Sequence, residues 1–198
     1  METMEQIEQI FSKEIARMRE LSRESTRDIV MFTKHCLSMA GLGFWTSPAS
    51  KTGVNHPLTS NGYGGNIVHT KSTFWIADTI CKTVYDENDE TERLDYACVL
   101  SACLLHDLDK FIDSLETHGG HAADRINMEI ERIDKGNIYF RLISFGVRHH
   151  MGKFGNTDYS TWLRDVMPRS RFEHVARAVH LADYLSSRRF LEFNHDFT

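Results

Sequence analysis

The sequence has little of several features that mark particular classes of protein. It contains three prolines, two of which lie in one stretch, and its four cysteines show no CxxC spacing, which weakens a zinc-finger interpretation. No apolar run approaches the roughly 20 residues needed to cross a bilayer. The charged start METMEQIEQIF also lacks the apolar core of a signal peptide. We therefore expect a cytoplasmic protein with reduced, buried cysteines and no membrane partner.

Basic residues are not in excess either. The formal net charge is −5, so the chain has no overall positive field for an extended nucleic-acid duplex. A phosphate-bearing partner would have to be held by local cations or by a metal. No strand pattern persists, and repeats and low-complexity tracts are missing. These absences predict an all-α fold, with residues 1–198 forming a single domain.

The spacing of apolar residues predicts the helices. We expect them over about 4–22, 25–39, 66–85, 89–105, 119–134, 137–150, 160–166 and 170–188. In the helix at 119–134, apolar contacts should come from Ala122, Ile126, Met128, Ile130 and Ile133. Loop-forming residues concentrate in the segment 41–65, and so long a connection is usually functional. Its aromatic residues Phe44, Trp45 and Tyr63 would form a lid or, as is more common, fix the loop to the protein.

The stretch from Cys98 to Lys110, CVLSACLLHDLDK, organises the rest of the chain. Its first eight residues are apolar except for one serine and predict a buried helix, which ends at His106 and Asp107. Burying such groups costs several kcal/mol unless they are paired or bound to something, and a metal ion is one reason to place them there. An isolated His-Asp pair is more often a helix cap followed by a loop, so the metal interpretation depends on partners elsewhere.

The rest of the chain supplies such partners, because it contains 11 histidines, several of them near helix ends or on inward helix faces. The candidate metal ligands are His69, His106, Asp107, His121, His149, His150 and Asp183. Imidazole and carboxylate together suit Fe, Mn, Zn or Ni, and a carboxylate can bridge two ions. Neighbouring helical residues diverge by about 100°, so two adjacent histidines serve one site only if the helix end turns into it. Ordinary core or cap roles are expected for His35, His56, His118, His174, His180 and His195, with His118 and His180 as groups that would support the ligands.

The order of these residues resembles the H…HD…D pattern of the HD superfamily of metal-dependent phosphohydrolases. The segments GGNIVHT, HDLDK, GGHAADRI, FGVRHHMGKFG and VHLADYLSSR are similar to successive blocks of that family. The resemblance covers about residues 44–190, and FWTSPAS followed by GGNIVHT resembles small bacterial and phage members. It implies a compact helical bundle around the metals, with the loop 41–65 near the site and the helices of residues 4–40 packed on this core.

The resemblance also implies roles for individual residues. His69, His106, Asp107 and Asp183 would hold one ion, and Asp107 would bridge to a second ion held by His121, His149 and His150. Lys110 resembles the phosphate-binding lysine of the family's HDxxK pattern, with a surface lysine as the alternative. Arg125, Arg148 and Lys153 would neutralise substrate phosphates or be ordinary solvated charges. The GYP loop of HD-GYP proteins is missing, so cyclic di-GMP is not implied.

The expected function is a phosphohydrolase with two divalent transition-metal ions. Two ions can clamp the attacking and leaving oxygens of a phosphoryl displacement and activate a water. The substrate would be a nucleotide or a short oligonucleotide, cleaved at a phosphodiester or phosphoanhydride. Two alternatives stay open: an HD-fold diiron oxygenase similar to inositol oxygenase, which needs one histidine rather than a pair at 149–150, and a metal-binding protein without turnover. All of these are compatible with a homodimer.

Overall fold

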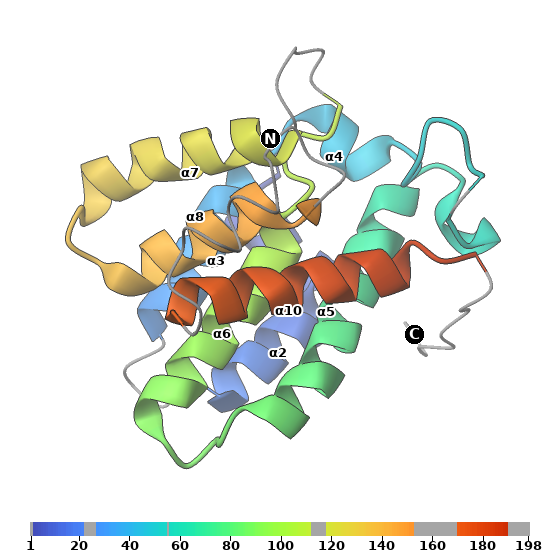
Figure 1. Cartoon of the computed structure of the whole chain (residues 1–198). Coiled ribbons are helices and arrows are strands. Elements are labelled where there is room, and N and C mark those ends of the chain that lie inside the picture. Colours follow the sequence, from blue (N-terminus) through green and yellow to red (C-terminus); the bar gives the residue numbers. More distant parts are fainter. Residues whose placement is uncertain (1, 22–26, 55, 112–117, 153–169, 190–198) are drawn as a thin grey trace.

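The computed structural model describes residues 2–21, 27–54, 56–111, 118–152 and 170–189. Its helices are α1 (Met4–Ile10), α2 (Ser12–Leu21), α3 (Arg27–Ser38), α4 (Leu42–Thr46), α5 (Gly65–Val84), α6 (Glu90–Leu105), α7 (His118–Ile133), α8 (Ile138–His149) and α10 (Arg171–Ser186), with a 3-10 turn η2 (Leu58–Ser60). No strand occurs in the described ranges, which confirms the all-α prediction (Figure 1). Within the same ranges, no helix combines the length and apolar character that crossing a membrane requires. The helix predicted at 160–166 and the start of the one predicted at 25–39 lie outside the described residues.

Polar side chains cap the N-termini of several of these helices. Asp89 accepts a hydrogen bond from the backbone N–H of Glu92, and Asn137 and Ser170 cap α8 and α10 in the same way. One boundary differs from the prediction, because the expected helix 4–22 is divided at Phe11, where φ is −108° and ψ is 34°. The division lets α1 pack on α3 while α2 reaches α5 and α6.

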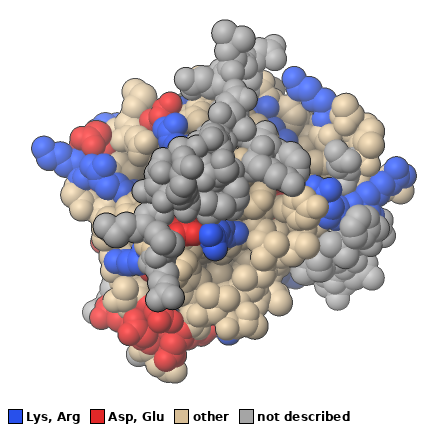
Figure 2. Space-filling view, viewed as in Figure 1, with Lys and Arg blue, Asp and Glu red and all other residues tan. Residues whose placement is uncertain are grey.

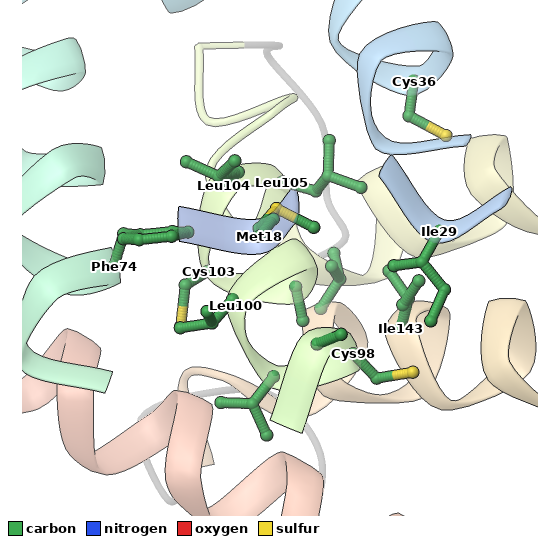
Figure 3. Packing of buried hydrophobic residues seen from close by; sticks show 14 of the residues in the cluster. Met18, Ile29, Cys36, Phe74, Cys98, Leu100, Cys103, Leu104, Leu105 and Ile143 are labelled. Carbon is green, nitrogen blue, oxygen red and sulfur yellow. The ribbon is translucent and has the colours of Figure 1, made fainter. Parts of the chain in front are cut away.

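Helix α6 lies at the centre of the fold. Every residue from Arg93 to Leu105 is buried, and the helix contacts α2, α3, α5, α8 and α10 (Figure 1). Figure 3 shows Met18 of α2, Phe74 of α5 and Ile143 of α8 around it. Each buried leucine or phenylalanine contributes roughly 1.5–3 kcal/mol relative to an exposed one, so the end of α6 is firmly held. The prediction of a buried helix over 98–105 is confirmed.

The four cysteines are buried and form no disulfide. Burial raises the pKa of the Cys98 and Cys103 thiols well above the ordinary value, so both stay uncharged. They pack as small apolar side chains, as the sequence predicts.

Two aromatic residues fix the segment 41–65 to the protein. Phe44 and Trp45 belong to the apolar core, with ring centroids 4.9 Å apart in an edge-to-face arrangement. Tyr63 is 88% exposed and does not take part. Phe44 and Trp45 therefore fix the loop to the protein, which is the more common of the two roles expected for them.

Helix α7 buries a narrower face than the sequence predicts. Ala122, Ile126 and Ile130 are buried, but Met128 and Ile133 are 71% and 51% exposed. The prediction that these last two supply apolar contacts is wrong, because the main neighbour of α7 is α8, which covers only one side of it.

The acidic stretch 86–92 covers the turn between α5 and α6 and the first residues of α6, and it is exposed to solvent. Figure 2 shows its red side chains at the lower edge of the molecule. On the face shown there, lysine and arginine side chains lie in separate groups rather than in one continuous patch.

A buried ion-pair cluster joins α2, α5 and α6. The Asp78 side chain is 2% exposed and lies 2.7 Å from Arg17 Nε and 2.6 Å from Lys82 Nζ. The Tyr96 hydroxyl donates to the same carboxylate at 2.5 Å. Burial raises the pKa of Asp78, but the hydrogen bonds from Lys82, Tyr96 and Arg17 outweigh this effect, and the net shift is downward.

We expect Asp78→Asn to lower the free energy of unfolding by about 3 kcal/mol at pH 7, because breaking a buried pair leaves its partners uncompensated. A carboxyl whose pKa is depressed on folding contributes stability above its unfolded pKa of about 3.9, and this is lost as the pH falls through the folded value. Urea unfolding at pH 7 and at pH 3 should therefore show a smaller difference between wild type and variant at pH 3. Asp86→Asn, at an exposed position, is the control. An equal difference at both pH values would contradict the assignment.

Candidate metal centre

Three elements that are distant in sequence bring one group of ligand atoms together. His69 lies on α5, His106 directly follows α6, and Asp183 lies on α10. His69 Nε2 is 3.2 Å from His106 Nε2 and 3.1 Å from Asp183 Oδ1. His106 Nε2 is 3.6 Å from the same Asp183 oxygen. Ligand atoms about 2.1 Å from an ion, at angles of 90–110°, lie about 3.0–3.4 Å apart. Two of the three separations lie in this range and the third is just above it, so the three atoms could hold a metal ion.

A second group lies beside the first. His118 Nε2 is 3.2 Å from Asp107 Oδ1 and 3.1 Å from His150 Nε2. His150 Nε2 is 3.9 Å from the same carboxylate oxygen. His118 is the first residue of α7, and His150 directly follows α8.

Asp107 connects the two groups. Its Oδ1 faces His118 and His150, while its Oδ2 lies 3.3 Å from His106 Nε2 and 3.5 Å from His69 Nε2. The side chain is 1% exposed. A buried carboxylate with one oxygen directed at each group could bridge two ions.

Backbone carbonyls determine which nitrogen of two rings carries the proton. His106 Nδ1 is 2.7 Å from the carbonyl oxygen of Cys103, and His150 Nδ1 is 2.7 Å from that of Val147. Because a carbonyl only accepts, Nδ1 is the donor in both rings, and each neutral ring presents a lone pair on Nε2.

On the far side of the site, Ser186 completes the support of His69. Its hydroxyl donates to the carbonyl of Asp183 at 2.9 Å and lies 3.2 Å from His69 Nδ1, whose proton it accepts in this orientation. The Nε2 lone pair of His69 then faces that of His106. Lone pairs and carboxylates that converge in this way, each oriented from behind, fit a bound cation.

Burial and charge set the protonation states of the ligands. Burial lowers the pKa of His150 to about 3 and also lowers that of His69, so both rings are neutral at pH 7. Burial raises the pKa of Asp107, but the charges of His106 and Lys110 outweigh it, and the pKa lies well below the ordinary value. For His106, burial lowers the pKa, but the charge of Asp107 outweighs it, and the net shift is upward.

A cavity of about 350 Å³ opens beside the two groups. Its walls are formed by His56, Asp107, Lys110, His118, His150, Met151, His180, Asp183, Tyr184, Ser187 and Arg188. The His56 ring packs edge-to-face on His69, with centroids 5.0 Å apart, which confirms that the loop 41–65 lies near the site. Lys110 Nζ is 2.5 Å from Asp107 Oδ2, so a cation lies directly beside this carboxylate.

Five of the seven candidate ligands lie together in the structure: His69, His106, Asp107, His150 and Asp183. His149 and His121 belong to neither group. His149 packs on Phe145, with ring centroids 4.3 Å apart, because adjacent residues at the end of α8 point in different directions. His118, expected only to support the ligands, occupies the place predicted for His121, one helical turn later.

The predicted phosphate-binding cations are mostly engaged elsewhere. Arg125 forms an ion pair with the buried Asp109 and donates to the carbonyl of Met39 at 2.6 Å. Arg148 pairs with Asp124 at the surface, and neither arginine lines the cavity. Lys153 lies outside the described residues. Of the three that the structure describes, only Lys110 contributes to the cavity wall.

A close contact holds the end of α8 in place. His180 Nδ1 donates to the carbonyl oxygen of His150 at 2.6 Å. Gly152, at φ +53°, lies against the same ring, and a Cβ there would come within 2.6 Å of it. Glycine is therefore required at this position for two independent reasons, its backbone conformation and the neighbouring ring.

We expect Gly152→Ala to weaken binding of a second ion by about 10-fold or more, because displacing His180 frees the segment that carries His150. Calorimetric titration with Mn²⁺ or Zn²⁺ measures this directly. Gly136→Ala is the matched control, since its added Cβ would meet its nearest neighbour at an ordinary 3.5 Å. Unchanged affinity for two ions in folded Gly152→Ala protein would exclude a positioning role.

Comparison with known proteins agrees with this geometry. An HD-domain family model matches residues 66–188, a range that contains both ligand groups. Neither curated proteins nor solved structures gave a significant match. The chain belongs to the HD-domain superfamily of metal-dependent phosphohydrolases.

Proposed function

We propose that the chain is a phosphohydrolase that cleaves a phosphodiester or phosphoanhydride of a nucleotide or short nucleic acid with the help of two divalent transition-metal ions. Family membership supports a metal-dependent hydrolase. The observation that carries the finer proposal is Asp107, whose two oxygens face two separate groups of histidines. Two ions held there would supply Lewis acidity and a water that is acidic enough to react near neutral pH.

The protein's own residues would bind and orient the substrate. Lys110, whose side chain is 18% exposed, offers a cation to the reacting phosphate beside Asp107. The cavity volume is near the lower end of the range for small-ligand sites, about 300–1,000 Å³, which suits one nucleotide unit better than a duplex. The buried histidines behind it keep bulk water away from the far side of the centre.

Metal removal tests this proposal. Protein purified without chelator should hydrolyse bis(p-nitrophenyl) phosphate, and dipicolinate treatment should abolish the turnover. Restoration by Mn²⁺, Fe²⁺, Zn²⁺ or Ni²⁺ would identify the active metal. Turnover that survives complete removal of metal, or no turnover with any of the four ions, would refute the proposal.

One observation favours a second candidate, a diiron oxygenase. Only His150 of the adjacent histidine pair faces the site, so the paired histidines no longer argue for the hydrolase. The clustered residues then number six: His69, His106, Asp107, His118, His150 and Asp183. Six ligands are expected for the HD-fold oxygenases. Oxygen consumption by the iron-loaded protein with a polyol substrate, without hydrolysis of any phosphate ester, would favour the oxygenase.

A further inference from the structure

We propose that Arg188 binds a second anionic group of the substrate, next to the phosphate that reacts. The preferred substrates would then carry two neighbouring phosphates. This inference rests on the proposed phosphohydrolase function and narrows its substrate class.

The guanidinium of Arg188 is held in a defined orientation at the cavity. Its Cζ lies 3.8 Å from the centre of the Tyr184 ring, and its Nε donates to the carbonyl of Tyr184 at 3.1 Å. Both residues line the cavity. A guanidinium carries five N–H donors in a planar fork, so two contacts that use its face and its Nε leave the Nη donors for another acceptor.

No carboxylate neutralises this arginine among the residues that the structure describes. Lys110, the other cation of the cavity wall, pairs with Asp107 at 2.5 Å. Most other described arginines also pair with a carboxylate, as Arg171 does with Asp95. Arg188 is therefore a cation at the cavity whose charge is left to a ligand, and a planar guanidinium suits the oxygens of a phosphate.

Arg188 and Lys110 reach the cavity wall from different parts of the chain. Arg188 follows Asp183 by five residues and lies outside α10, which ends at Ser186. Lys110 stands beside the bridging carboxylate, whereas Arg188 lies beyond the last turn of α10. Two cations at different places in one cavity match a molecule with two phosphates. Nucleoside polyphosphates and 5′-phosphorylated dinucleotides share this chemistry.

Kinetics of Arg188→Gln with matched substrates test the inference. The thymidine dinucleotides pdTpdT and dTpdT differ only in the 5′-phosphate, and ATP represents the nucleoside polyphosphates. We expect the KM penalty of the variant to be at least 10-fold larger for pdTpdT or for ATP than for dTpdT. Whichever of the two shows the larger penalty identifies the source of the second phosphate. Arg189→Gln, at the exposed neighbouring position outside the cavity wall, should behave as wild type.

The outcome separates this inference from the proposed function. Equal penalties for all three substrates, with hydrolysis intact, would overturn the role of Arg188 and leave the phosphohydrolase standing. If no substrate is hydrolysed, equilibrium dialysis of ADP and AMP against the metal-loaded protein decides the matter. A loss of ADP binding at least 10-fold greater than the loss of AMP binding in Arg188→Gln would support the anion site alone, and equal losses would overturn it.

Discussion

Asp107→Asn should release metal and reduce phosphodiester hydrolysis by on the order of 10³-fold. The amide keeps the shape of the side chain but loses the charge and one of the two acceptor oxygens that face the histidine groups. Metal ions stabilise the charge of a phosphoryl transition state by several kcal/mol, and about 4 kcal/mol corresponds to a factor of 10³ in rate. Metal content by elemental analysis and turnover of bis(p-nitrophenyl) phosphate should fall together.

Asp124→Asn provides the matched control for this substitution. Asp124 pairs with Arg148 at the surface, where its side chain is 55% exposed, so the same chemical change should alter neither metal content nor turnover. Circular dichroism shows whether the Asp107 variant keeps its helices. A folded Asp107→Asn protein with wild-type activity would remove the basis for a bridged centre.

His118→Ala should abolish binding of the second ion, whereas His121→Ala should retain it. His118 Nε2 lies within 3.2 Å of both Asp107 Oδ1 and His150 Nε2, and its loss leaves only two protein ligands in that group. Removal of a group that merely supports a ligand costs 10–100-fold in metal affinity, so the loss of a ligand should cost at least 100-fold. Calorimetric titration should show one binding step for His118→Ala and two for His121→Ala.

The comparison of these two variants also shows whether the second ion is bound by His118, as the structure indicates, or by His121, as the sequence pattern implies. Both replace a histidine on the first turn of the same helix, α7, so a general loss of helix stability would affect them alike. Loss of the second ion in His121→Ala alone would contradict the role of His118 and favour the ligand set that the sequence pattern implies.

The sequence was most informative where local chemistry decides the structure. The apolar run before His106 predicts a buried helix, and α6 is indeed surrounded on all sides. Asp89 and Asn137 cap helices because a side-chain oxygen at that point satisfies free backbone donors. His106 and Asp107 are brought to the centre by the end of that central helix.

Helix phase limits what the sequence reveals about the second group. His118 and His121 are three residues apart and both lie on the first turn of α7, so only the exact start and direction of the helix select between them. The same holds for His149 and His150, where the end of α8 turns one ring toward Asp107 and the other toward Phe145. Such choices depend on tertiary packing, which the spacing of residues does not contain.

The cations show a related limit. Arg125 lies close in sequence to the ligand blocks, yet the buried carboxylate of Asp109 engages it. Arg188 follows the end of α10, and only its stacking on Tyr184 shows that it lies at the cavity. Whether an arginine has a carboxylate partner can be decided only when the positions of the surrounding residues are known.

The most direct test of a two-metal centre bridged by Asp107 is anomalous X-ray diffraction from crystals of the Mn²⁺- or Zn²⁺-loaded protein. We predict two anomalous peaks about 3.5–4 Å apart, with Asp107 Oδ2 at the ion held by His69, His106 and Asp183, and Asp107 Oδ1 at the ion held by His118 and His150. A single peak at saturating metal, or a second peak that Asp107 does not touch, would contradict this account.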